Sequence, residues 1–297
     1  MTQAPTPEQL VADLLLLLDL EPRGPDRFEG RRKQGGIGRV FGGQVIAQAL
    51  AAAERTVDEG RAAHSLHAYF LRGGSEDHTI GYAVDRQFDG GSFSNRRVVA
   101  SQNGTPIFNM AVSFQRQQAG LEHQVAEMPQ VPQPEELETD DVLRAQFADK
   151  LDGRARAFFM QPRPIEIRAS NARHWMSEGP QPPVQNSWFR AKAPLPDDPR
   201  VHRAVLAYLS DMQLLGTAIM PHGLSWMRGE VKSASLDHAI WFHAPFRADE
   251  WLLYATDSPW SGGNRGFNRG QIFTRDGRLV ASVAQEGMIR KVAPRGG

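Results

Sequence analysis

Apolar residues along the chain follow two spacings, one typical of helices and one typical of strands. Apolar residues three and four positions apart predict helices at residues 7–20, 43–55, 140–150 and 201–218. Alternation of apolar and polar residues between turn-forming residues predicts strands in both halves of the chain. The strands lie at residues 26–32, 64–71, 80–86, 95–102 and 106–115, and then at 164–169, 187–191, 234–243, 252–257, 266–274 and 279–290.

The second half of the chain repeats the first, because in each a long helix is followed by consecutive antiparallel strands. Short segments match at a nearly constant offset. His67-Ala68 corresponds to His238-Ala239, and Asn103-Gly104 corresponds to Asp276-Gly277. Asn103-Gly104 and Asp276-Gly277 are both typical of type I′ hairpin turns. Several matches in the same order indicate an internal duplication.

This duplication predicts an α+β fold of two similar domains, each with a sheet wrapped around its long helix. We place the N-terminal domain at residues 1–117 and the C-terminal domain at residues 161–297. Residues 118–160 contain several prolines and little strand pattern, so we predict that they connect the two domains.

The composition is that of a globular protein with a substantial core, since 40% of the residues are apolar and 23% are charged. Lys plus Arg and Asp plus Glu both number 34, which argues against nucleic-acid binding. The absence of cysteine excludes disulfides, thiolate nucleophiles and zinc ribbons. The apolar run at residues 14–18 is too short to span a membrane, and no targeting signal is evident, so we expect a cytoplasmic location.

Two polar residues of the second half interrupt an otherwise apolar pattern. Asp211 lies beside the apolar stripe of the helix predicted at residues 201–218, where a carboxylate is partly desolvated and needs partners. Gln285 is the one polar side chain on the inward face of its strand, where the first half has Val112. A helix cap or a hydrogen bond between strands would explain these residues, and so would a functional site.

Longer segments resemble the type II acyl-CoA thioesterases, in the family's order and over nearly the whole chain. They are residues 40–44, 64–72 and 89–94 in the first half, and 210–211, 221–223, 236–238, 241–243 and 285–287 in the second. The resemblance implies a double hotdog fold, in which two helix-and-sheet repeats are fused. It also implies an active site of Asp, Thr or Ser, and Gln. These three positions fall on Asp211, Ser235 and Gln285, where Ser235 replaces the more common Thr.

The resemblance further implies that the protein hydrolyses fatty acyl-CoA to fatty acid and coenzyme A, without a covalent intermediate, a metal or another cofactor. Asp211 would accept a proton from water, and Ser235 and Gln285 would hold that water. Backbone amides at a helix N-terminus are the expected oxyanion donors. The assignment of Ser235 depends mainly on the resemblance, which also leads us to expect a homodimer or a larger homo-oligomer.

Four further residues are candidates for substrate binding, each with an ordinary structural alternative. Gln44 begins the first long helix, and His64 could lie near the thioester or between the two halves. Arg96 and Arg97 could contact the coenzyme A phosphates, or could lie on a solvated strand face.

Two other functions remain as alternatives. A hotdog enoyl-CoA hydratase or dehydratase needs an Asp-His pair, for which Asp237-His238 is a candidate, although adjacent strand residues face opposite ways. The second alternative is a protein that binds acyl-CoA in the same pocket but does not catalyse a reaction. A metal site is not expected, because His238 and His243 lie an odd number of residues apart on one strand and so point to opposite faces.

Overall fold

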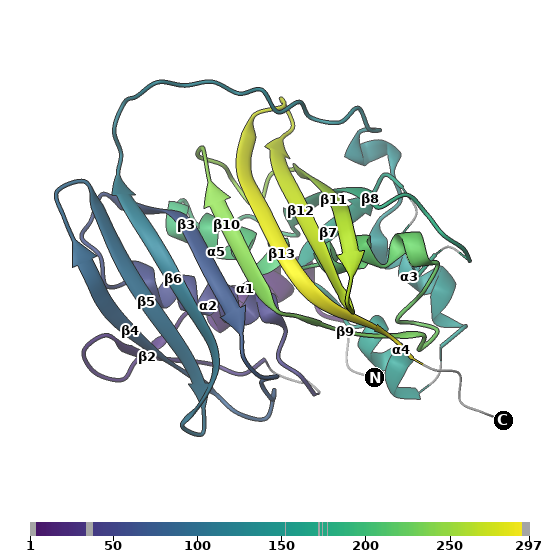
Figure 1. Ribbon diagram of the computed structural model, residues 1–297, viewed down its shortest axis with the longest axis horizontal. Coiled ribbons are helices and arrows are strands. Elements are labelled where there is room, and N and C mark those ends of the chain that lie inside the picture. Colours follow the sequence, from purple (N-terminus) through teal and green to yellow (C-terminus); the bar gives the residue numbers. More distant parts are fainter. Residues whose placement is uncertain are drawn as a thin grey trace.

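The computed structural model describes residues 4–33, 38–151, 153–171, 173, 175–176 and 178–292. One large antiparallel sheet runs through the molecule, and the long helices lie against one of its faces (Figure 1). Among the described residues, no helix is long and apolar enough to cross a membrane.

In the N-terminal half, the described residues form two helices and six strands. Helix α1 (Pro7–Leu18) begins with a capping box between Thr6 and Gln9, and helix α2 (Gly42–Glu54) is the long helix of this half. The strands are β1 (Glu21–Pro22), β2 (Arg27–Gly30), β3 (Arg61–Phe70), β4 (Ile80–Asp89), β5 (Phe93–Gln102) and β6 (Thr105–Arg116). They pair in the order β1-β2-β4-β5-β6-β3.

The C-terminal half follows a connecting segment that passes over one end of the sheet (Figure 1). That segment contains η1 (Pro134–Glu136), α3 (Asp140–Ala148) and α4 (Gly153–Phe159). The helical elements of this half are α5 (Pro199–Ser210), η2 (Leu214–Ala218) and η3 (Met220–His222). Its strands are β7 (Ile165–Ala169), β8 (Val184–Ala191), β9 (Val231–Ser235), β10 (Asp237–Phe242), β11 (Leu252–Gly262), β12 (Arg265–Thr274) and β13 (Leu279–Lys291).

The two halves join edge to edge through β3 and β10, so that the sheet continues as β10-β13-β12-β11-β8-β7. The matching segments of the duplication pair with each other at this junction. His238 lies opposite Ala68, and Ala239 lies opposite His67. Because both halves use the same strand order, the predicted duplicated α+β fold is confirmed.

Helices α2 and α5 pack against each other and form the centre of the core. Helix α2 carries the small residues Ala47, Ala49, Ala52 and Ala53, all of them fully buried. Small side chains let α5 and the strands approach the backbone of α2 closely, which explains why this helix is Ala-rich.

The second long helix is shorter than the sequence predicts. It ends at Ser210 rather than at residue 218, and Asp211 is its C-cap. The chain then turns through Gln213, which has a left-handed φ of 72°, before continuing as η2. A left-handed residue commonly ends a helix because it turns the chain away from the helical path.

The strand predicted at residues 234–243 is also divided. β9 and β10 both pair with β13, but the register shifts by one residue between Ser235↔Gly287 and Ala239↔Ala284. β3 has a corresponding shift between Ala63 and Ser65. Such a bulge re-aims neighbouring side chains, and here it lies beside Ser235.

The two predicted hairpin turns differ. Asn103 and Gly104 have φ values of 49° and 75°, as a type I′ turn requires. At the second hairpin only Gly277 has a positive φ, so the turn at Asp276 is not type I′.

Candidate active site

Asp211, Ser235 and Gln285 meet at one point, although they come from three different elements. Asp211 ends α5, Ser235 ends β9 at the bulge, and Gln285 lies in the middle of β13. Nε2 of Gln285 donates to Oδ1 of Asp211 at 2.6 Å. The hydroxyl of Ser235 donates to the same oxygen at 3.3 Å.

The N-terminus of α2 approaches the same carboxylate from the other half of the molecule. The backbone N–H of Gly43 donates a hydrogen bond to Asp211, and α2 has no side-chain cap of its own. Asp211 therefore serves as the acceptor for the positive end of this helix. A Cβ added at Gly42 would lie 2.6 Å from Oδ2 of Asp211, so only glycine permits this approach.

Burial dominates the electrostatics of Asp211. Desolvation raises its pKa from 3.8 to about 6, while the hydrogen bonds from Gln285, Gly43 and Ser235 lower it in part. The side chain is half-buried, because it keeps a face toward a cavity while protein surrounds the rest. A carboxylate with this pKa is able to accept a proton near neutral pH.

His238 lies behind Gln285 and orients its amide. Nε2 of Gln285 lies 3.1 Å from Nδ1 of His238, and Nε2 of His238 lies 2.9 Å from Oγ of Ser210. Burial lowers the pKa of His238 to about 3, so the ring is neutral and Nδ1 accepts from Gln285. Nε2 then donates to Ser210, whose hydroxyl donates to the carbonyl of Ala207 at 2.9 Å.

Both amide hydrogens of Gln285 are thus used, one by Asp211 and one by His238. Its amide oxygen has no hydrogen-bond partner among the described residues, and the side chain is fully buried. Gln285 therefore contacts the Asp211 carboxylate and does not line the cavity. From the sequence, His238 is a candidate for an Asp-His pair with Asp237 and for a metal site with His243, but its contact with Gln285 is not predicted.

A cavity of about 830 Å³ opens beside Asp211, a volume typical of small-molecule sites. Both halves line it, with Phe41 and Phe70 from the first and Ser235 and Trp226 from the second. The connecting segment closes one wall through Arg144 and its neighbours. The site thus lies where three parts of the chain meet.

Comparison with known proteins places the chain in one family. Residues 155–288 match the acyl-CoA thioesterase family, and residues 31–115 match the acyl-CoA thioesterase N-terminal domain. The chain is 42% identical to acyl-coenzyme A thioesterase 8 of Homo sapiens over 282 residues, which cover 92% of this chain and 88% of that protein. The chain belongs to the acyl-CoA thioesterase family.

Solved structures agree with this membership. The crystal structure of acyl-CoA thioesterase II TesB2 from Mycobacterium marinum matches with a TM-score of 0.76 at 41% identity, over 94% of this chain and 98% of that one. A hot dog fold protein of unknown function from Alicyclobacillus acidocaldarius matches with a TM-score of 0.74 at 18% identity, over 94% and 98% of the two chains. The predicted family, enzyme class and double hotdog fold are confirmed.

The two halves of this thioesterase-family chain differ at the equivalent positions. Gln285 lies opposite Asn268 on β12, and its counterpart Val112 lies opposite Arg96 on β5. Arg96 is only 1% exposed. Its guanidinium donates to Thr56, Phe88, Asn95 and Asp89 at 2.7–3.1 Å. Arg96 therefore fills the first half's equivalent of the site and is not available to a coenzyme A phosphate.

The other three candidates for substrate binding also lie outside the cavity wall. Gln44 is 2% exposed and faces the backbone of Arg31. His64 shares a hydrogen bond of 2.8 Å with Ser113, and Arg97 is exposed on β5. The spacing and type of these three residues in the sequence do not distinguish them from residues that line a cavity.

The structure also bears on the candidate pair Asp237-His238 and on a possible metal site at His238 and His243. Asp237 accepts from the backbone N–H of Glu286 at 2.7 Å, whereas the ring of His238 points to Gln285 and Ser210. His238 is buried and His243 is exposed, as the odd spacing predicts. Within the described parts of the chain, no group of three or more His, Asp or Glu residues could hold a metal ion.

Proposed function

We propose that this protein hydrolyses acyl-coenzyme A thioesters by direct attack of water, with Asp211 as general base. The observation that carries the proposal is the placement of Asp211. A carboxylate with a raised pKa faces a cavity of about 830 Å³ and lies against a helix N-terminus. Water activation needs a proton acceptor of this kind, next to a site that can stabilise negative charge.

The positions of the contacting groups support the following reaction. A water between Asp211 and Ser235 gives its proton to Asp211 as its oxygen bonds to the thioester carbonyl carbon. The first amide of α2, the N–H of Gly42, is the proposed donor to the oxyanion, since the first N–H groups of a helix lack intrahelical partners. Collapse of the intermediate breaks the carbon–sulfur bond, and Asp211 returns the proton to the thiolate.

Ser235 and Gln285 have different parts in this proposal. Ser235 lines the cavity and is able to bond both the water and Asp211. Gln285 is fully buried, so it holds the carboxylate of Asp211 rather than the water. A covalent acyl-serine is not proposed, because the neutral ring of His238 contacts Ser210 and Gln285 rather than Ser235.

A thiol-release assay tests the proposal against its alternatives. Acyl-CoAs of several chain lengths are mixed with wild-type protein, Asp211→Asn and Asp237→Asn. We expect thiol release by wild type, a loss of roughly 10²–10⁴-fold in Asp211→Asn, and near wild-type rates in Asp237→Asn. Asp237 is a matched control because it is also partly buried and hydrogen-bonded, but does not line the cavity.

Two outcomes would favour other functions. Loss of enoyl absorbance from an enoyl-CoA without free thiol, abolished in Asp237→Asn, would indicate a hydratase. Binding of acyl-CoA without either reaction would indicate a protein that binds acyl-CoA without turnover.

A further inference from the structure

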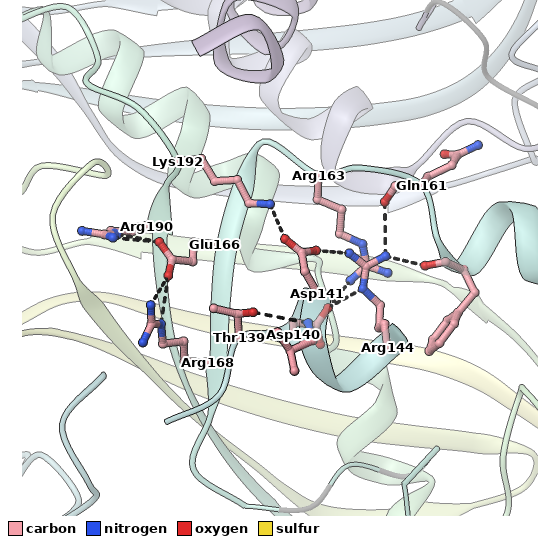
Figure 2. A network of polar contacts seen from close by, with 12 residues as sticks. Thr139, Asp140, Asp141, Arg144, Gln161, Arg163, Glu166, Arg168, Arg190 and Lys192 are labelled. Carbon is pink, nitrogen blue, oxygen red and sulfur yellow. Dashed lines mark hydrogen bonds and ion pairs between the residues drawn. The ribbon is translucent and has the colours of Figure 1, made fainter. Parts of the chain in front are cut away.

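Three arginines surround one carboxylate in the wall of the cavity. Asp140, at the start of α3, forms ion pairs with all three: its Oδ2 lies 2.9 Å from Nε of Arg144 and accepts a hydrogen bond from Nη1 of Arg163 at 3.0 Å, and its Oδ1 lies 2.8 Å from Nη1 of Arg173. Figure 2 shows Arg144 and Arg163 converging on Asp140. All four residues line the cavity that also contains Asp211.

The charges in this cluster do not balance. Asp141 pairs with Lys192 and also contacts Arg144, so it offsets one cation. Among the residues that the structure describes, Asp140 then remains as the single negative partner of three guanidinium groups. The side chains of Arg144, Arg173 and Asp140 are at most 4% exposed, so water does little to compensate. Buried charge without a partner is costly, which favours binding of an anion.

Several donors of the cluster are unused. Arg163 is 27% exposed and contacts the described residues through Nη1 alone, which leaves Nε and Nη2 of its fork. Nε and Nη2 of Arg173 are buried and have no hydrogen-bond partner in the described parts of the chain. Burial lowers the pKa of Arg163, and it lowers the pKa of Arg173 to about 10. A planar fork with free N–H groups suits the paired oxygens of a phosphate or a carboxylate.

The cluster lies near the thioester site. Arg163 and Tyr208, which lies one turn before Asp211, both line the cavity that contains Asp211. A group held by Arg163 would therefore lie in the same cavity as a thioester at Asp211.

We propose that Arg163, supported by Arg144 and Arg173, forms a subsite for an anionic oxygen group of the substrate. The group is either a phosphate of coenzyme A or a carboxylate on the acyl chain, because both offer the same paired oxygens. This inference rests on the proposed function, since it places the substrate in the same cavity.

A purely structural role is the competing explanation, because the cluster also ties the connecting segment to the C-terminal half. Arg190 provides the control. It pairs with Glu166 at 2.8 Å and lies over the ring of Trp251, outside the cavity wall. Figure 2 shows the Arg190–Glu166 pair apart from Arg163. Arg163→Gln and Arg190→Gln each remove one ion pair, but only Arg163 faces the cavity.

Both variants are assayed with hexanoyl-CoA, hexanoyl-pantetheine and adipoyl-CoA. A phosphate subsite predicts that Arg163→Gln raises KM for hexanoyl-CoA at least tenfold more than for hexanoyl-pantetheine, which lacks the phosphates. A carboxylate subsite predicts a KM increase at least tenfold larger for adipoyl-CoA than for hexanoyl-CoA. Either result in Arg163→Gln, with a smaller than threefold change in Arg190→Gln, supports the proposal.

Equal KM effects on all three substrates, or equal effects in the two variants, would overturn it. Circular dichroism and melting temperature confirm that each variant is folded. If wild-type protein releases no thiol, the proposed function fails, and calorimetric titration with the same three compounds decides on the subsite separately. Binding of coenzyme A thioesters that is no weaker in Arg163→Gln than in wild type then overturns the subsite as well.

Discussion

The amide nitrogen of Gln285 lies 2.6 Å from the carboxylate of Asp211, across 74 residues of sequence. This contact joins the middle of β13 to the end of α5, and it directs the carboxylate toward the cavity. The Gln285 amide is itself hydrogen-bonded to His238, so the position of the proposed base depends on Gln285 directly and on His238 through Gln285.

The rate of thiol release should fall in acid. The pKa of Asp211 is raised to about 6, mainly by burial, and a general base must be deprotonated. We expect kcat/KM to be constant above pH 7 and to fall about tenfold per pH unit well below pH 6. Measuring kcat/KM from pH 4.5 to pH 9 tests this fall in acid. A profile that stays flat down to pH 4.5 would contradict the assignment of Asp211.

Asp211→Asn should be more stable than wild type at high pH. Because the folded protein raises the pKa of this acid, it binds more protons than the unfolded chain between about pH 4 and pH 6. The stability that this group contributes is present below pH 4 and is lost as the pH rises through 6. Asn removes the charge, so we expect a gain of at most ~3 kcal/mol at pH 8, less where cavity water solvates the carboxylate. Urea unfolding at pH 8 and pH 4 tests this, and equal effects at both values would be inconsistent with it.

Ser235→Ala should slow the reaction less than Asp211→Asn does. The hydroxyl of Ser235 donates to Asp211 at 3.3 Å, and loss of one hydrogen bond to a charged group costs roughly 1.5–3 kcal/mol. We expect kcat to fall roughly 10- to 100-fold. The fall of kcat/KM in acid should begin at a higher pH, because that hydrogen bond lowers the pKa of Asp211. Ser235→Thr keeps the hydroxyl and should retain most of the activity. Similar rates in the Ala and Thr variants would remove Ser235 from the mechanism.

His238→Leu should lower kcat roughly tenfold with little change in KM. His238 touches Gln285 but does not line the cavity, so it positions the base without contacting substrate. The control is His243→Leu, since His243 is hydrogen-bonded to Ser282 at 2.8 Å on the same part of the chain and is exposed. A lower melting temperature with unchanged kcat in His238→Leu would mean that the ring is only structural.

Gly42→Ala should impair activity through Asp211. The added Cβ would lie 2.6 Å from Oδ2 of Asp211 and 2.9 Å from Cζ of Phe70, so the carboxylate or the helix must shift. We expect kcat to fall at least tenfold and stability to fall by roughly 1–3 kcal/mol. Gly91→Ala is the matched control, because a Cβ there meets nothing within 4 Å. Equal kcat values in the two variants would show that the close approach at Gly42 is not needed.

Much of the architecture followed from local patterns. Strand periodicity, the Ala-rich helix and the repeated order of elements predict the duplicated α+β fold. The errors fall where the chain departs from regular geometry, at Gln213 and at the bulge beside Ser235. A left-handed residue or a one-residue register shift depends on packing with distant segments, and apolar periodicity does not record it.

The sequence by itself determined the family, the duplicated fold and two polar positions, Asp211 and Gln285, that interrupt apolar faces. The family follows from the resemblance of longer segments. The fold and the two polar positions are readable because burial imposes a period on each element, and a polar residue that breaks the period is visible without knowing its neighbours. Only the tertiary structure decided that α2 begins against Asp211, that His238 contacts Gln285 from the side away from the cavity, and that Arg96 is enclosed while Arg163 faces the cavity. The contacts of Asp211 with α2 and of Gln285 with His238 join residues far apart in the chain, and the packing of the sheet and its helices decides that Arg96 is enclosed while Arg163 faces the cavity.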